Sequence, residues 1–114
     1  MGRPRLTASE YADKILEDLK QKNNGKLPRS ITIEVGELFP ISAKDMKLEL
    51  SSRIMNRLAV NEKKSKVKCA CGYIGAAKIV RRSDTDVEFE CPMCGDIPEI
   101  LDGNHLKVLD FTND

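Results

Sequence analysis

Apolar residues near the start of the chain recur at the spacing of an α-helix. Tyr11, Ile15 and Leu19 are each four residues apart, and this apolar stripe ends at Asn23-Asn24-Gly25. The stripe is preceded by Thr7-Ala-Ser-Glu10, which has the form of a capping box at a helix start. The pattern predicts an amphipathic helix whose apolar face, Tyr11 included, packs in the core.

The pattern then changes to the period of two that is typical of a strand. Ile31, Ile33 and Val35 alternate with polar residues as far as Gly36, which predicts a strand with one buried face. Pro40 breaks the segment that follows.

A second helix is predicted after Ser42, because Asp45 follows three residues later, as at a capped helix start. Its inward face is predicted from Met46, Leu50 and Ile54, which are each four residues apart, and Met55 and Leu58 are expected near its end. Residues 57–68 mix apolar residues with lysines and predict one strand that leads toward the cysteines. Lysines on an edge strand oppose unwanted pairing, so four lysines are expected to form a solvated edge: Lys63, Lys64, Lys66 and Lys68.

Two short segments, 78–81 and 87–90, flank the turn-like residues 83–86 and predict a hairpin. After a further turn at 102–104, four apolar residues predict a last strand that returns to the first sheet: Leu106, Val108, Leu109 and Phe111.

The length and the charge of the chain limit which classes of function it can have. The 114 residues leave room for one ordinary domain, or for a small core with a metal-stabilised appendage. Nineteen basic and 18 acidic residues give a net charge of +1, which argues against a dedicated nucleic-acid binder. No apolar signal or membrane-spanning segment is present, so we expect a cytoplasmic protein that does not contact a membrane.

Every cysteine lies in one of two short clusters, Cys69-Ala-Cys71-Gly72 and Cys91-Pro-Met-Cys94-Gly95. The glycine after each cluster tolerates the left-handed backbone of a tight turn. The spacing predicts one metal site with four thiolate ligands: Cys69, Cys71, Cys91 and Cys94. Zinc is favoured and iron is the main alternative, whereas a reducing cytosol argues against disulfides.

A site with four protein ligands is closed and therefore structural, since it leaves no position for water or substrate. The sequence has no phosphate loop and no nucleophile-and-base pattern, so we expect no enzyme, no catalytic residue and no residue that binds an organic cofactor. His105, the single histidine, is a weaker metal candidate, because a lone histidine near a turn is usually solvated or hydrogen-bonded.

The order of these elements resembles that of the hydrogenase nickel-incorporation family HypA/HybF. The resemblance covers nearly the whole chain, and its most specific segments are Ile33-Glu-Val-Gly-Glu37-Leu38, Val67-Lys-Cys69 with Cys71-Gly-Tyr73, Phe89-Glu-Cys91-Pro-Met-Cys94-Gly95 and Leu101-Asp-Gly103-Asn-His-Leu-Lys-Val108. It implies an α+β protein in which two helices pack on a small three-stranded sheet, with an inserted four-cysteine zinc-ribbon lobe. Residues 1–66 and 104–114 would form the helix/sheet lobe, and residues 67–103 the zinc-ribbon lobe.

The resemblance also implies a metallochaperone, a monomer or weak dimer, that hands nickel to a hydrogenase large subunit together with a nickel-handling GTPase. The family holds nickel through an amino-terminal Met-His-Glu, using the terminal amine, backbone nitrogens and the imidazole. Here the second residue is Gly2, and alignment of the first helices places Ser9 at the histidine position and Glu10 at the glutamate position. Serine is a poor nickel ligand. We therefore predict that the family's nickel site is absent, and that the chain delivers nickel through other ligands or acts as an adaptor.

A zinc-ribbon nucleic-acid-binding protein is the alternative function. Its support is the lysine run, the basic residues of the predicted hairpin, and Gly2-Arg-Pro-Arg5, which is similar to the core of a minor-groove-binding hook. Acidic residues on the same hairpin offset its basic ones, and no aromatic platform for bases accompanies them.

Overall fold

The computed structural model describes residues 7–83 and 86–113. Its elements in chain order are α1 (Ala8–Lys22), β1 (Ser30–Gly36), α2 (Ala43–Ser51), β2 (Arg57–Lys63), β3 (Lys66–Lys68), β4 (Ile74–Gly75), β5 (Lys78–Arg82), β6 (Val87–Glu90), β7 (Glu99–Asp102) and β8 (Leu106–Thr112). No helix within these ranges is long and apolar enough to cross a membrane.

Both predicted helix starts are confirmed by their caps. The hydroxyl of Thr7 accepts a hydrogen bond from the Glu10 amide at 3.2 Å, and the Glu10 carboxylate accepts one from the Thr7 amide at 3.1 Å. At α2, the hydroxyl of Ser42 accepts from the Asp45 amide at 3.1 Å. Each cap satisfies amide groups that the first helical turn leaves without a partner.

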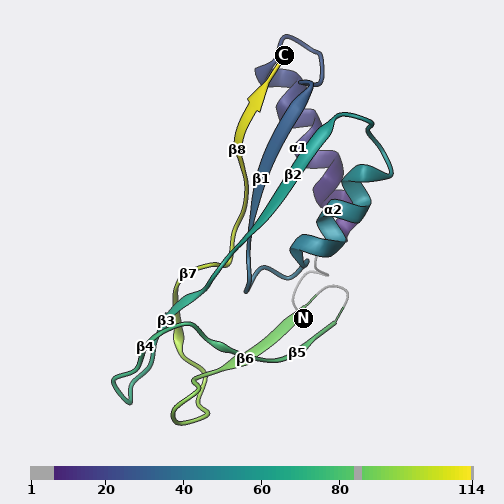
Figure 1. Ribbon diagram of the computed structural model, residues 1–114. Coiled ribbons are helices and arrows are strands. Elements are labelled where there is room, and N and C mark those ends of the chain that lie inside the picture. The colour runs from purple at the N-terminus through teal and green to yellow at the C-terminus, as the bar shows by residue number, and fades with distance from the viewer. Residues whose placement is uncertain (1–6, 84–85, 114) are drawn as a thin grey trace.

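Three strands in the order β2-β1-β8 form the first sheet. β1 pairs with β2 in parallel and with β8 antiparallel, so the end of the chain returns to the first strand as predicted. Figure 1 shows α1 and α2 on one face of this sheet. The buried core between helices and sheet consists of Ala12, Ile15, Leu19, Ile31, Ile33, Val35, Phe39, Ile41, Met46 and Leu50. The predicted α+β class with two helices on three strands is confirmed.

The predicted extent of the second helix is wrong. α2 ends at Ser51, so Ile54 and Met55 lie beyond the helix, and Met55 is fully exposed. The hydroxyl of Ser52 donates to the carbonyl of Glu49 at 2.7 Å. Serine side chains that bond to nearby backbone groups in this way compete with helical hydrogen bonds, which accounts for the early end.

Residues 57–68 form two strands and not the single strand that the sequence predicts. β2 is an edge strand of the first sheet, whereas β3 is the central strand of a second sheet in the order β4-β3-β7. β5 and β6 form a separate antiparallel hairpin, as predicted from the sequence. Figure 1 shows the β3, β4 and β7 strands at the end of the first sheet, with the β5–β6 hairpin alongside.

The two sheets meet where two glycine backbones come into close approach. A Cβ atom on Gly36 would lie 2.1 Å from the carbonyl oxygen of Gly103, and one on Gly103 would lie 2.6 Å from the Cα of Ser65. The Leu38 amide donates to the Gly103 carbonyl at 2.7 Å. Only residues without side chains can come this close together. The crossing joins the end of β1 to the connection between β7 and β8.

Polar contacts extend this junction. The buried carboxylate of Glu37 accepts hydrogen bonds from the amide of Ser65, at 3.1 Å, and from its hydroxyl. The same hydroxyl accepts from the Ala77 amide at 3.0 Å. Arg82, at the end of β5, donates to the carbonyls of Glu37 and, at 3.0 Å, of Phe39. These contacts tie the cysteine-bearing part of the chain to the loop that leads into α2.

Candidate metal centre

The four cysteines converge at one point, although the two pairs are far apart in the sequence. Their Sγ atoms all lie within 4.8 Å of one another. Across the two pairs, the Sγ atoms of Cys69 and Cys94 are 3.4 Å apart, and those of Cys71 and Cys91 are 3.7 Å apart. Cys69 and Cys91 are buried, while Cys71 and Cys94 are exposed. The structure therefore brings together all four residues that the sequence predicts as ligands.

Each cysteine pair lies on a tight turn that follows a strand. After β3, the Gly72 amide donates to the Cys69 carbonyl at 2.9 Å, and after β6 the Gly95 amide donates to the Cys91 carbonyl at 2.9 Å. The two glycines have φ angles of +100° and +82°. This left-handed backbone is the one expected from the sequence, and it folds both turns toward the same point.

The surroundings of the sulfurs favour a negative charge on Cys91 and oppose one on Cys94. Burial opposes ionisation of Cys91, but amide hydrogen bonds from Cys94 and Met93 lower the pKa of its thiol to about 7. The Asp96 amide favours the thiolate of Cys94, yet the neighbouring sulfur of Cys69 and burial raise the pKa of Cys94 to about 12. Four sulfurs this close cannot all lose their protons unless a cation offsets their charges.

The donor set matches what a soft divalent ion requires. Four convergent sulfurs are positioned to bind one metal ion, and no other group of three or more His, Cys, Asp or Glu side chains in the described ranges is so arranged. Amide groups already point at the sulfurs, as the Met93 amide does at 3.4 Å from the Cys91 Sγ. Such hydrogen bonds hold thiolate ligands in orientation around a metal.

His105 lies away from the cysteines in a different set of contacts. Its Nε2 is 2.6 Å from Glu34 Oε2, and its Nδ1 is 3.6 Å from Asp102 Oδ1. The hydrogen bond from His105 holds the pKa of the Glu34 carboxyl below its usual value, with help from Lys107. The histidine is therefore hydrogen-bonded beside the junction between the sheets, as expected for a lone histidine near a turn.

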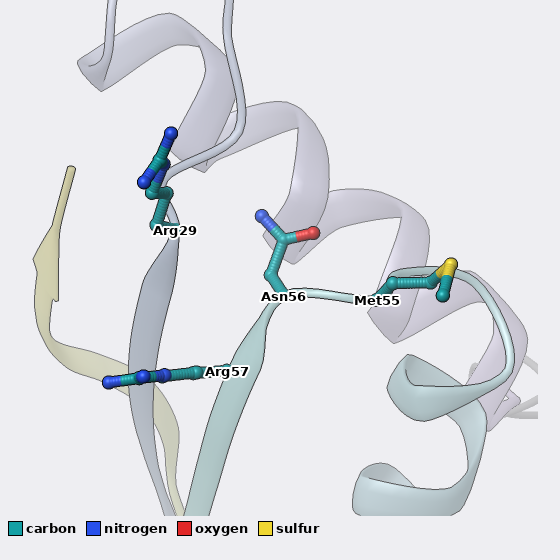
Figure 2. Close-up of a pocket in the computed structure, with 4 residues that line it drawn as sticks. All are labelled: Arg29, Met55, Asn56 and Arg57. Carbon is teal, nitrogen blue, oxygen red and sulfur yellow. The ribbon is translucent and has the colours of Figure 1, made fainter. Parts of the chain in front are cut away.

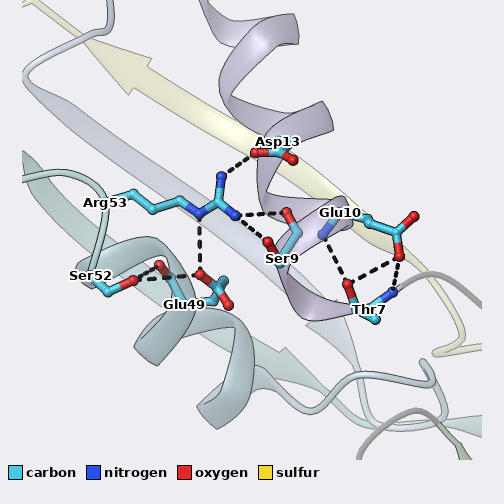
Figure 3. A network of polar contacts seen from close by, with 7 residues as sticks. All are labelled: Thr7, Ser9, Glu10, Asp13, Glu49, Ser52 and Arg53. Carbon is cyan, nitrogen blue, oxygen red and sulfur yellow. Dashed lines mark hydrogen bonds and ion pairs between the residues drawn. The ribbon is translucent and has the colours of Figure 1, made fainter.

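The start of α1 carries a network that sequence reasoning missed (Figure 3). The guanidinium of Arg53 donates to both the carbonyl, at 3.1 Å, and the hydroxyl of Ser9. It also pairs with Asp13, and with Glu49 at 3.1 Å. Glu49 and Arg53 are four residues apart and could be paired from the sequence, but Ser9 is 44 residues from Arg53 and gives no such signal.

Comparison with known proteins places this geometry in a wider context. No family model matches the sequence, and no curated protein matches it. Among solved structures, the solution structure of the nickel metallochaperone HypA from Helicobacter pylori aligns with a TM-score of 0.50 at 14% sequence identity. The alignment covers 94% of this chain and 97% of that chain. The two proteins share a fold. The resemblance to the HypA/HybF family that the sequence motifs indicate is thereby confirmed at the level of the fold.

Proposed function

We propose that this chain is a HypA-like accessory protein in the maturation of a nickel metalloenzyme, a hydrogenase, and that it carries a structural zinc. The observation that carries the proposal is the fold shared with a nickel metallochaperone along nearly the full length of both chains. The four convergent cysteines support it, because the resemblance to the HypA/HybF family implies a zinc ribbon at the same place in the element order.

The proposed role of the zinc is to hold the cysteine-bearing segment in its fold. Four thiolates occupy every position of a tetrahedral ion, so the metal would not bind water or substrate there. The segment has few buried apolar residues, among them Val67 and Val87, and a lobe of this size cannot offset its conformational entropy without such a ligand. We expect zinc in preference to iron.

For nickel, we propose that the chain acts as an adaptor and not as a carrier that binds the ion in the manner of the family. The position that the resemblance assigns to the nickel-binding histidine is Ser9, whose oxygens already accept hydrogen bonds from Arg53. A guanidinium is always charged and repels a second cation beside it. Glu10, at the glutamate position, is engaged in the capping box.

The proposed partners are a nickel-handling GTPase and a hydrogenase large subunit, in the cytoplasm, with the chain as a monomer or weak dimer and without an enzymatic activity of its own. Affinity capture with the tagged, zinc-loaded chain from cells of its own source tests this. We expect a GTPase of metal delivery or a hydrogenase subunit to be enriched over an unrelated zinc-ribbon bait.

Recovery of neither protein would contradict the proposal. A salt titration with DNA and RNA distinguishes the alternative, because a nucleic-acid-binding protein loses affinity steeply as salt rises. On the hairpin, Arg81 is paired with Glu88 at 2.7 Å and Lys78 with Glu90 at 3.7 Å, so we expect no useful affinity. The segment Gly2-Arg-Pro-Arg5 lies outside the described residues.

A further inference from the structure

A pocket lies between α1 and the edge of the first sheet. Its volume is about 400 Å³, and its lining comes from α1, from β8 and from the loop after β1. The rings of Tyr11 and Phe39 contact each other there, with their centroids 4.9 Å apart. The apolar residues that line the pocket are Tyr11, Ile15, Phe39, Leu106 and Val108. Three of them, Tyr11, Leu106 and Val108, are only half-buried, so the pocket leaves an apolar surface open to solvent.

β8 is an edge strand, with β1 on one side and no strand of the described residues on the other (Figure 1). The Gly36 amide donates to the His105 carbonyl at 2.8 Å, and the antiparallel register then continues without a shift as far as Val108. In an antiparallel pair, backbone groups point toward the partner strand at every second residue and away from it at the others. Since the His105 carbonyl points toward β1, the amides and carbonyls of Leu106 and Val108 point outward.

The same two residues turn their side chains toward the helices. Leu106 and Val108 each lie opposite a fully buried residue of β1, Val35 and Ile33 respectively. Neighbours on a strand alternate between faces, so Lys107 faces the opposite side of the sheet. A further strand beside β8 could therefore form hydrogen bonds to Leu106 and Val108 and place every second side chain in the pocket.

Positive charge lies on both sides of this edge. On α1, Lys22 is paired with Asp18 at 3.0 Å, whereas Lys14 lines the pocket and has no ion pair within residues 7–83 and 86–113. On the other face of the sheet, Lys107 Nζ is 3.6 Å from Glu34 Oε2, which is longer than a hydrogen bond. The charge that these lysines offer to a partner favours acidic side chains.

The opposite edge of the sheet, at β2, does not combine these features. The pocket at its start is lined by Arg29, Met55, Asn56 and Arg57, without an aromatic or β-branched side chain. Figure 2 shows the side chains of its two arginines pointing away from each other. Of the two edges of this sheet, β8 is thus the one that has outward backbone groups beside an aromatic and aliphatic pocket.

We propose that the pocket between α1 and β8 binds an extended segment of a partner protein, which adds a strand to β8. The segment forms backbone hydrogen bonds with Leu106 and Val108. Its side chains that face the helices are large and apolar, and those that face Lys107 are acidic. Backbone bonds supply affinity in this mode of binding, and the pocket selects the side chains. The inference does not depend on the proposed role in nickel-enzyme maturation.

Titration of the zinc-loaded full chain with a capped octapeptide that alternates valine and glutamate tests the inference. Backbone amide signals in ¹H–¹⁵N NMR spectra should shift saturably at Leu106 and Val108. We expect a dissociation constant of about 0.1–1 mM, because a short peptide loses conformational freedom when it binds. A peptide with lysine in place of glutamate should bind about tenfold more weakly. N-methylation of alternate backbone amides keeps the side chains but removes hydrogen-bond donors, and should abolish binding.

Variants separate local from general charge effects. Lys14→Gln and Lys107→Gln should each weaken binding of the glutamate peptide about threefold, since each removes one exposed positive charge beside the pocket. Lys20→Gln is the matched control, because Lys20 is exposed on α1 but does not line the pocket, and it should leave binding unchanged.

Three results would overturn the inference: no saturable shift at Leu106 and Val108 with the glutamate peptide, equal binding of the lysine peptide, or equal weakening by Lys20→Gln. Dilution of the chain without peptide tests the other occupant of this edge. If the same two amide signals shift with protein concentration, β8 pairs with a second copy of the chain, and the proposed partner segment is wrong.

Discussion

At the scale of single residues, contacts that the sequence does not reveal decide what the start of α1 can do. The capping box at Thr7 and Glu10 was predictable, because its members are three residues apart and the chemistry is local. The hydrogen bond from Arg53 to Ser9 and its ion pair with Asp13 were not predictable, because they depend on how α2 crosses α1. The same applies to Glu37, whose partner Ser65 lies 28 residues away.

Replacement of Arg53 by glutamine should lower the melting temperature of the helix/sheet part. The neutral side chain cannot pair with Asp13 and Glu49 together, so α1 and α2 lose their charged link. Arg81→Gln is the matched control, since Arg81 pairs with Glu88 on its own hairpin and the substitution should change the melting temperature little. Circular dichroism at 222 nm follows both variants. Equal melting temperatures for the two would show that the link between the helices contributes nothing.

Glu37 should make stability depend on pH in the acid range. Burial opposes its ionisation, but the two hydrogen bonds from Ser65 and the nearby Lys64 outweigh burial and lower the pKa of Glu37 below 4.5. A carboxyl whose pKa is lowered by folding stabilises the fold above its unfolded pKa, and this contribution is lost as pH falls through the folded value. The free energy of unfolding, measured by urea titration at pH values between 6 and 3, should therefore fall less steeply in Glu37→Gln. An unchanged slope would contradict the assignment.

At the scale of elements, the cysteine turns and the glycine crossing determine where the candidate metal centre lies. The turns were predictable from the clusters, because each cysteine pair is followed by a glycine that adopts a positive φ angle. The end of α2 was mispredicted because the apolar spacing continues past Ser51, whereas the Ser52 hydroxyl bonds to the Glu49 carbonyl at the point where the helix ends. The division of the chain into residues 1–66 with 104–114 and residues 67–103 stays a prediction.

Replacement of Cys94 by serine should remove bound zinc and unfold the cysteine-bearing segment, while α1, α2 and the first sheet stay folded. The helices have their own buried core and do not contribute ligands. Met93→Ser is the control, because Met93 lies between Cys91 and Cys94, is exposed and is not among the predicted ligands. Metal analysis should find one zinc per chain in the control and none in the variant. Loss of the helical circular dichroism signal in Cys94→Ser would contradict the independence of the two lobes.

Alanine at Gly36 should destabilise the protein by about 3 kcal/mol, because its Cβ would lie 2.1 Å from the Gly103 carbonyl oxygen and the backbones would have to separate. Alanine at Gly25 is the comparison. Gly25 has a φ of +84°, but a Cβ atom added there would meet nothing within 4 Å, so only local strain, about 1 kcal/mol, is expected. Urea titration measures the free energy of unfolding of both variants. If alanine at Gly36 lowers it no more than alanine at Gly25, the crossing can open without cost.

At the scale of the whole molecule, the architecture was more predictable than the assignment of function. The periods of the apolar residues gave the two helices, the central strand and the returning strand, because one buried face imposes a regular spacing. Sheet order and the split of residues 57–68 needed the structure, because pairing between distant strands leaves no local pattern. The solved structure of a nickel metallochaperone shares the fold of this chain, and Ser9, the position that the resemblance assigns to the nickel-binding histidine, is bound by Arg53.

A calorimetric titration of nickel into the zinc-loaded chain tests the central claim, that the HypA fold is kept here without a nickel site at the start of α1. Three proteins are compared: the unaltered chain, Ser9→His, and a shortened chain in which residues 1–7 are removed and the sequence begins Met-His-Glu10. The first two should bind nickel much more weakly than the third, because only the third combines an imidazole with a free terminal amine. Tight, stoichiometric nickel binding by the unaltered chain would contradict the account and identify a working nickel carrier that uses other ligands.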